Sequence, residues 1–333
     1  MAEHPEERPV VAIIGGDTLL ARELRELLAE SAAAPRVQLI SAAPDGAAML
    51  IPRDPEAPIM VPLAAETLEG SRVAFLAGSP ASSRRTLKLH AEDGPRLVDL
   101  TGALEEQPQA RLRAPSAEAS RPAGESPIQV IAHPAAIAIA MLLAALARIA
   151  PLRRSIIHVF EPASERGQRG LDELQQQTVA VLSFQKLKRD IFDAQLGFNL
   201  LARYGEEAEE PLELIEQRLE RHLASLLAAY PAIPMPSIRL IQAPVFHGHS
   251  FSVWVEFDEA PGVENLAKSL TKEGFDVRHD EPPNNVGVAG QSGLSIGTIV
   301  EDRNHPRACW LWMAADNLRL AAENAVAVGQ ESL

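Results

Sequence analysis

The chain has 333 residues, 46% of them apolar and 23% charged, and its formal net charge at pH 7 is −14. This length predicts two domains, and the acidic balance argues against nucleic acid as a partner. The single cysteine, Cys309, excludes an internal disulfide, and the nine histidines show no metal-ligand spacing, so we expect no metal site.

No part of the sequence predicts a membrane segment. The first nine residues are polar and lack the basic and apolar regions of a secretion signal. The most apolar stretch, residues 134–147, is shorter than the roughly 20 residues that a membrane helix needs. We therefore expect residues 134–147 to form a buried helix in a cytoplasmic protein.

Strand and helix patterns alternate over the first 100 residues. Residues 10–15 are an apolar run that ends in glycine, and leucines then recur at helical spacing up to Leu28. Strand patterns follow at 37–41, 73–78 and 97–100, with a helix pattern over 81–92. This alternation predicts an α/β domain with a parallel, Rossmann-type sheet. Residues 105–127, rich in Pro, Ala, Ser, Arg and Glu, predict a loose connector.

The rest of the chain predicts an α+β domain. It begins with a strand at 128–132 and the helix after Pro134. Its other strand patterns alternate more and are separated by hairpin-like turns, which predicts a mixed or antiparallel sheet with one covered face. These strands are expected at 155–160, 238–243, 251–257, 276–279, 294–300 and 309–314, with helices at 171–186, 212–229, 262–273 and 316–328.

Six motifs occur in an order that resembles the aspartate-semialdehyde dehydrogenase family, especially its Usg-like branch. They span nearly the whole chain, and each is weak alone. The motifs are VVAIIGG at the start, VIAHP before the long helix, GLDELQQQT, APVFHGHS, PPNNV and ADNLRLAAENAV.

The resemblance implies a fold, an activity and an assembly. It implies an NAD(P)-binding Rossmann-type domain over residues 1–127, a dimerisation and catalytic-type domain over 128–314, and a C-terminal helix over 315–333 that packs back on the first domain. The family oxidises an aldehyde in amino-acid biosynthesis with NADP and works at least as a homodimer. A cysteine thiolate attacks the aldehyde, the adduct gives a hydride to NADP, and phosphate releases the acyl group.

The nucleophile position is the largest departure from the family pattern. The family motif reads N-P-N-C-S-T, and residues 133–138 here read HPAAIA, so Ala136 takes the place of the cysteine. A methyl group can neither attack a carbonyl nor leave from one. Cys309 lies in another segment, CWLWM, and cysteine is usually a buried residue, so we interpret Cys309 as a core residue.

The resemblance also places the family's other site residues. His249 takes the place of the general base, which suits proton transfer near neutral pH, although a histidine bonded in a cleft wall is an equal alternative. Glu161 replaces a substrate-orienting glutamine. Gln242 and Glu105 replace two arginines that clamp anionic groups, so the strong phosphate and carboxylate contacts are lost. Glu173 is kept, and we expect it on a solvated helix face.

The resemblance implies that NADP would contact the turn after the first strand, at Gly15, Asp17, Thr18 and Leu19. The family pattern there is G-x-x-G-x-x-G, of which this chain keeps Gly15 and replaces the later glycines by Thr18 and Ala21. Asp17 adds a negative charge where phosphate would bind. The residues therefore favour a turn that only caps a helix, with Asp17 or Thr18 as the cap.

Three hypotheses follow. The first is an inactive homologue that acts as a dimeric structural or regulatory protein, as a homodimer or with an active paralogue. The second is an NAD(P)-dependent oxidoreductase that acts on an aldehyde by a cysteine-independent route. The third is a small-ligand sensor, in which Glu105, Glu161 and His249 favour a neutral or cationic ligand.

Overall fold

The computed structural model describes residues 8–43, 59–119 and 126–333. Two compact units make up the chain. The first comprises Met1–Pro115, Ser120–Ala132 and Ala321–Leu333, and the second comprises Ser116–Ala119 and His133–Leu320. Of the N-terminal stretch discussed above, residues 1–7 lie outside the described residues. No helix in the described part of the chain is long and apolar enough to cross a membrane.

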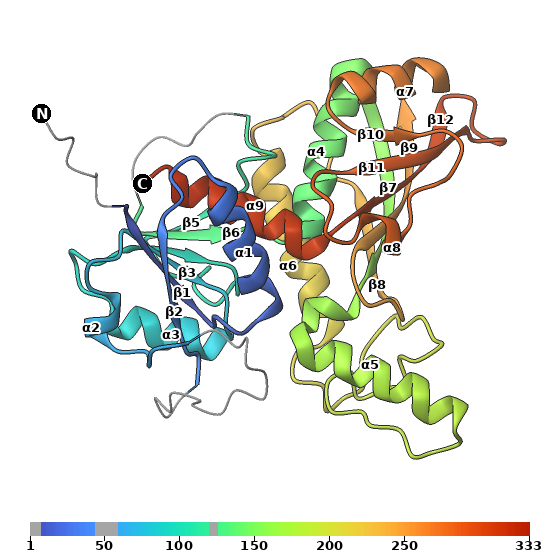
Figure 1. Cartoon of the computed structure of the whole chain (residues 1–333). Coiled ribbons are helices and arrows are strands. Elements are labelled where there is room, and N and C mark those ends of the chain that lie inside the picture. The colour runs from blue at the N-terminus through green and yellow to red at the C-terminus, as the bar shows by residue number, and fades with distance from the viewer. Residues whose placement is uncertain (1–7, 44–58, 120–125) are drawn as a thin grey trace, which may run out of the picture. The chain divides into compact units, whose positions relative to one another are not determined.

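A six-stranded parallel sheet forms the centre of the first unit (Figure 1). The strand order is β2-β1-β3-β4-β6-β5, and every neighbouring pair is parallel. The central strand β3 is buried along its length because its four residues are all apolar. The strands are β1 (Val10–Ile14), β2 (Arg36–Ile40), β3 (Val73–Leu76), β4 (Arg96–Asp99), β5 (Ala110–Arg113) and β6 (Ile128–Ile131). The predicted Rossmann-type α/β fold is confirmed.

Helices α1 (Leu19–Glu30), α2 (Ala65–Leu68) and α3 (Pro80–Leu89) complete the alternation of strands and helices. Strand β1 is followed by β2 on one side and then by β3 on the other side. In open parallel sheets, ligands bind outside the carboxyl ends of the strands at such a reversal. The turn that begins at Gly15 lies at this position.

Two sequence expectations about residues 105–132 are wrong. The connector predicted over 105–127 contains strand β5, and the strand expected to open the second domain is β6, which lies between β4 and β5. Strand β5 escaped prediction because its sequence, ARLR, is half arginine. Arg113 is nevertheless buried there, because Glu331 binds it through an ion pair of 2.8 Å. Residues 120–125 of the expected connector lie outside the described residues.

The last helix, α9 (Asn317–Gln330), begins in the second unit and ends in the first. Gly329 lies so close to the ring of Phe75 in β3 that an added Cβ would be 2.5 Å from it. The end of the chain is also held by Arg113, through its ion pair with Glu331. Residues 321–333 thus pack on the parallel sheet.

The second unit contains a six-stranded mixed sheet with the order β10-β11-β12-β9-β7-β8. Pairs β7–β8 and β10–β11 are parallel, and the other three pairs are antiparallel. The mixed sheet predicted from the alternating patterns is confirmed. Its strands are β7 (Leu152–Glu161), β8 (Ser237–Gln242), β9 (His249–Phe257), β10 (Asp276–Arg278), β11 (Ser295–Glu301) and β12 (Ala308–Ala315).

Helices cover one face of this sheet. Helix α4 (Pro134–Ile149) contacts β7, α6 (Leu212–Leu227) and α7 (Val263–Lys272), and Figure 1 shows α4 and α7 beside the strands. Eleven of the sixteen residues of α4 are buried, as the apolar sequence predicts. The opposite face carries a row of register partners across β7, β9, β12 and β11, namely Ile156, Trp254, Trp310 and Val300. Ile156, Trp310 and Val300 are 42%, 37% and 47% exposed, whereas Trp254 between them is 6% exposed.

Helix α5 (Gly167–Leu182) organises the irregular segment that follows it, through two buried side chains. Glu173 accepts backbone N–H groups of Ile191 and Phe192 at 2.7 and 3.3 Å. Gln177 accepts those of Leu196 and Gly197 at 2.6 and 3.0 Å. The expectation that Glu173 lies on a solvated face is therefore wrong, because its carboxylate replaces water as the acceptor for this loop. The short elements η1 (Ala163–Arg166) and α8 (Asn285–Val288) complete the unit.

Candidate functional site

A buried polar cluster in the second unit begins with His133 at the start of α4. The Nδ1 atom of His133 accepts the N–H of Ala135 at 3.2 Å and so caps the helix. The backbone N–H of His133 donates to Nδ1 of His222 in α6 at 2.8 Å. Because a neutral imidazole that accepts at Nδ1 carries its proton on Nε2, the other ring nitrogen of His133 is a donor.

Glu161, the last residue of β7, provides the carboxylate of the cluster. Its Oε1 atom accepts Nη2 of Arg166 at 2.8 Å, and its side chain is fully buried. Arg166 lies five residues later in η1, which folds the chain back toward the end of β7. Nη1 of Arg166 donates to Glu210 at 2.9 Å, and Arg218 of α6 binds the second oxygen of Glu210 at 3.2 Å. Both terminal nitrogens of Arg166 are thus bonded to carboxylates.

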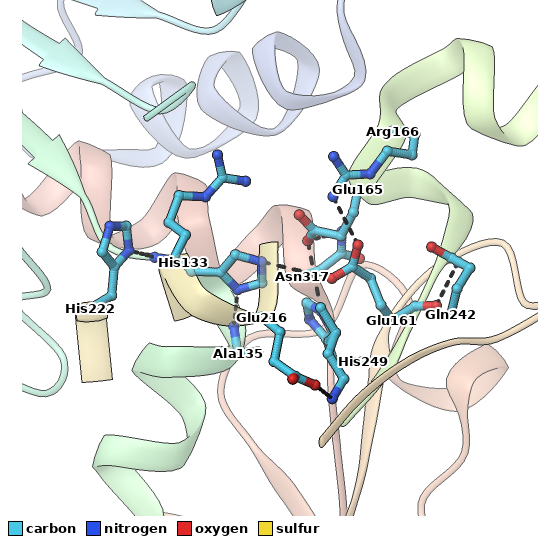
Figure 2. A network of polar contacts seen from close by, with 12 residues as sticks. His133, Ala135, Glu161, Glu165, Arg166, Glu216, His222, Gln242, His249 and Asn317 are labelled. Atoms are coloured by element: carbon cyan, nitrogen blue, oxygen red, sulfur yellow. Dashed lines mark hydrogen bonds and ion pairs between the residues drawn. The ribbon is translucent and has the colours of Figure 1, made fainter. Parts of the chain in front are cut away.

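His249, the first residue of β9, completes the cluster. Its ring centroid lies 5.8 Å from that of His133, and its Nε2 atom lies 4.0 Å from Oε1 of Glu165. Asn317 holds the surroundings in place, since its side chain donates to Glu165 at 2.8 Å and accepts the N–H of Gly248 at 3.1 Å. Figure 2 shows the rings of His133 and His249 and the carboxylate of Glu161 directed toward one another.

Among the described residues, five buried side-chain atoms of this region lack a hydrogen bond, and two of them are Nε of Arg166 and Nε2 of His222. The other three belong to His133, Glu161 and His249. Within the part of the chain that the structure describes, no donor or acceptor bonds His133 Nε2, Glu161 Oε2 or His249 Nε2, although all three are buried. His133 Nε2 and Glu161 Oε2 lie 3.8 Å apart, beyond hydrogen-bond length. Buried polar groups are almost always bonded, and an unbonded one costs about 1–3 kcal/mol. Such a group of atoms at one place makes the cluster a candidate functional site.

Burial sets the protonation of the cluster. It lowers the pKa of His249 to about 4, against partial opposition from the charges of Glu161 and Asp316. It also lowers the pKa of His133 well below its usual value, with help from His249 and the nearby arginines. Burial raises the pKa of Glu161, and Arg166 counteracts that rise. Both histidines are therefore neutral at physiological pH.

The structure brings together some of the predicted site residues. Glu161 and His249 lie in the cluster, and Ala136 is the third residue of α4, three positions after His133, where it is completely buried. Gln242 pairs with Glu161 in the β7–β8 register, and both polar atoms of its side chain are already hydrogen-bonded. It donates to the carbonyl of Glu161 at 2.8 Å and accepts the hydroxyl of Tyr204 at 2.5 Å. Gln242 is thus a structural link between strands.

Sequence reasoning missed His133, Glu165, Arg166 and Asn317 as members of this cluster. His133 was seen only as a changed motif position. Its place before Pro134 was a usable signal, because proline favours the first position of a helix and the preceding side chain then caps it. Nothing in the local pattern around Glu165 and Arg166 indicates that η1 turns them back onto β7.

The predicted cofactor turn lies in the first unit and is bonded internally. The hydroxyl of Thr18 accepts the N–H of Ala21 at 3.1 Å and lies 2.9 and 3.0 Å from the carbonyls of Gly15 and Ala77. Thr18 is therefore the cap of α1, while Asp17 is exposed and Leu19 is the first helical residue. Gly15 has φ of +85°, and an added Cβ would lie 2.4 Å from Cα of Gly78. A glycine is required there to join β1 and β3 closely.

Glu105 and Cys309, the two remaining residues from the sequence analysis, lie outside the cluster. Glu105 lies after β4 in the first unit and is half-buried. Cys309 is buried in β12, and burial raises the pKa of its thiol to about 12. A thiol so far from ionisation is a poor nucleophile. Among the described residues, no three His, Cys, Asp or Glu side chains are grouped to hold a metal ion.

Comparison with known proteins gives one family. Residues 142–320 match the semialdehyde dehydrogenase dimerisation domain. The chain is 31% identical over 264 residues to a USG-1 protein homolog of Pseudomonas aeruginosa, covering 78% of each. It is 24% identical over 345 residues to the aspartate-semialdehyde dehydrogenase of Prochlorococcus marinus, covering 98% and 96%. A solved structure of a probable aspartate-semialdehyde dehydrogenase from P. aeruginosa superposes with a TM-score of 0.80 at 26% identity, covering 97% and 98%.

Proposed function

The chain belongs to the semialdehyde dehydrogenase family, and we propose that it is a catalytically inactive member that acts as a dimeric structural or regulatory protein. The observation that carries this proposal is at the start of α4. We expect the nucleophile position at Ala136, whose side chain is completely buried and has no reactive atom. The one cysteine of the chain, Cys309, lies in β12 with a raised thiol pKa.

The charges around the cluster support the same proposal. A free guanidinium group is the strongest side-chain partner for the carboxylate of a semialdehyde. Both terminal nitrogens of Arg166 bind carboxylates instead, and the family's arginine position on β8 is taken by Gln242. The buried carboxylate of Glu161 would repel an anionic substrate. We infer that restoring the thiol alone would not restore the reaction.

The turn at Gly15 does not fit NADP well. The N–H groups of Gly15 and Gly16 both donate to Ile40, and the N–H of Ala21 donates to Thr18. These donors are the type of group that binds a pyrophosphate at a helix N-terminus. Asp17 adds a negative charge beside them. We therefore propose that this turn caps α1 and does not hold the cofactor.

A homodimer is supported by the uncovered face of the mixed sheet. The row Ile156, Trp254, Trp310 and Val300 lies on the face that α4 and α7 leave uncovered, and the matched family domain is described as a dimerisation domain. We propose a second copy as the occupant of this face. Trp310→Glu should then yield monomers in sedimentation velocity, whereas Val286→Glu, at an exposed position in α8, should leave dimers. An active paralogue as partner would show as mixed dimers on co-expression.

The decisive experiment measures phosphate-dependent NADP reduction with aspartate semialdehyde, together with calorimetric titration of NADP. We expect neither turnover nor NADP binding from the native protein or from Ala136→Cys. NADP binding by both proteins with turnover only in the variant would show that the nucleophile was the main loss. Turnover by the native protein would refute inactivity.

The alternative is an NAD(P)-dependent oxidoreductase that acts on an aldehyde without a cysteine. It is favoured by the unbonded Nε2 atom of His249, which could exchange a proton with a substrate oxygen. A cofactor that binds the folded state raises the melting temperature. The absence of any shift at millimolar NAD or NADP would remove this alternative.

A further inference from the structure

The cluster of His133, Glu161 and His249 also indicates which ligand it takes. Three of the unbonded buried atoms, besides Nε of Arg166 and Nε2 of His222, are Nε2 of His133, Nε2 of His249 and Oε2 of Glu161. The side chains that carry these three atoms are each at least nine-tenths buried. The question is which group would bond them. This inference deepens the proposed function, since it concerns the ligand class of the same site.

The unbonded atom of His133 is a hydrogen-bond donor, and the unbonded oxygen of Glu161 is an acceptor. His133 accepts at Nδ1, so its Nε2 carries a hydrogen and donates. Glu161 Oε2 is a carboxylate oxygen whose partner atom Oε1 is bound by Arg166, so Oε2 accepts. The two atoms are 3.8 Å apart. An oxygen at about 2.8 Å from each can reach both, and it must both accept and donate a hydrogen bond.

The charges of the cluster exclude an anion. The carboxylates of Glu161, Glu165 and Glu210 outnumber the guanidinium groups of Arg166 and Arg218 in this network. Carboxylate or phosphate oxygens would also face Glu161 Oε2, and neither atom would supply a hydrogen. An ammonium group is unsuitable for the opposite reason, because it would face the hydrogen on His133 Nε2 without offering an acceptor.

A hydroxyl group meets all of these conditions, since it is neutral and both donates and accepts. We propose that His133 and Glu161 bind a hydroxyl group of a small neutral hydroxy compound, with His249 Nε2 beside it. Glu161 is then the residue that determines specificity, because its charge rejects the carboxylates that a neutral amide would admit.

Three probes of equal chain length separate the possibilities. Propane-1,3-diol, malonate and 1,3-diaminopropane carry neutral, anionic and cationic end groups on the same carbon chain. Saturation-transfer NMR with the full-length protein should show the diol bound, and the other two at least about 10-fold more weakly, which corresponds to about 1.4 kcal/mol. Equal or stronger binding of malonate or the diamine would overturn the proposal, as would no binding of any probe.

Two variants assign the effect to these residues. His133→Asn keeps a side chain that can cap α4 but removes Nε2, and it should lose diol binding. Glu161→Gln should weaken diol binding about 10-fold and allow malonate to bind. Arg166 stays paired with Glu210 in that variant, which favours folding. Glu213→Gln makes the same change on the exposed side of α6 and should bind like the native protein.

Unchanged diol binding in both cluster variants would overturn the proposal, because the diol would then bind elsewhere. A crystal structure of the diol complex that shows only water between His133 and Glu161 would overturn it as well. None of these results depends on turnover. Catalysis with aspartate semialdehyde would refute the proposed inactivity, whereas the probe series alone decides the ligand class.

Discussion

The family resemblance predicted functional residues in two polar regions of this protein, and the two regions differ in how their hydrogen bonds are satisfied. At the β1–α1 turn of the first unit, Thr18 caps α1 and lies within bonding distance of two carbonyls. In the cluster of the second unit, three buried atoms of His133, Glu161 and His249 lack partners among the described residues. An internally satisfied turn stabilises the fold, while an unsatisfied cluster is retained at a cost in stability. The comparison supports our proposal that the cluster, and not the turn, binds a ligand.

The largest expected effect comes from removing the arginine that supports the cluster. Arg166→Ala leaves Glu161 without its charged partner and removes one of the two arginines that bind Glu210. Breaking a buried ion pair in this way should lower the free energy of unfolding by about 3–5 kcal/mol. The measurement is urea denaturation at neutral pH.

Arg169→Ala is the matched control for that variant. Arg169 lies three residues later, is largely exposed and contacts Glu209 at 3.6 Å. An exposed pair contributes about 0–1 kcal/mol. Similar losses in the two variants would contradict the view that Arg166 holds a buried network together.

The second prediction concerns pH. The pKa of His249 is lowered to about 4 in the folded state, from 6.5. The stability that this neutral histidine contributes is therefore fully present above pH 6.5 and is lost as the pH falls toward 4. At about 1.36 kcal/mol per pKa unit, the loss is about 3 kcal/mol.

His249→Asn should flatten the dependence of unfolding free energy on pH in this range, and chemical denaturation at a series of pH values measures it. The raised pKa of Glu161 acts in the opposite sense, since its contribution is present at low pH and is lost as the pH rises. The difference in this pH dependence between the native protein and the variant gives the contribution of His249. An unchanged slope would mean that the ring is not buried in its neutral form.

The same comparison shows what the sequence could and could not predict. The family resemblance predicted one site with Ala136, Glu161 and His249, and periodicity predicted both sheets and the buried helix α4. The sequence did not predict strand β5, because the burial of Arg113 depends on Glu331, which lies more than 200 residues away in the chain. It failed again at Arg166, whose ion pair with Glu161 depends on the turn η1. Both contacts are made by the ends of long side chains, and neither leaves a periodic pattern in the sequence.

The third prediction tests the turn. Thr18→Ala removes the cap of α1 and should lower the unfolding free energy by about 1 kcal/mol, whereas Thr18→Ser keeps a hydroxyl and should cost less. Binding of propane-1,3-diol should be the same in both variants, because the turn has no ligand role in this proposal. A gain or loss of NADP binding in a titration would show that the turn still contacts a cofactor.

The smallest expected effect on stability is at Glu161, one of the two residues that are proposed to bind the ligand. Glu161→Gln removes a buried charge with one unbonded oxygen, and Arg166 keeps its ion pair with Glu210. The lost ion pair and the relieved desolvation act in opposite directions, so the unfolding free energy should change by less than about 1 kcal/mol. A group that is retained for folding would cost several times more on removal. Urea denaturation of Glu161→Gln beside Arg166→Ala therefore separates the two roles within a single ion pair, and a loss comparable to that of Arg166→Ala would assign Glu161 to the framework.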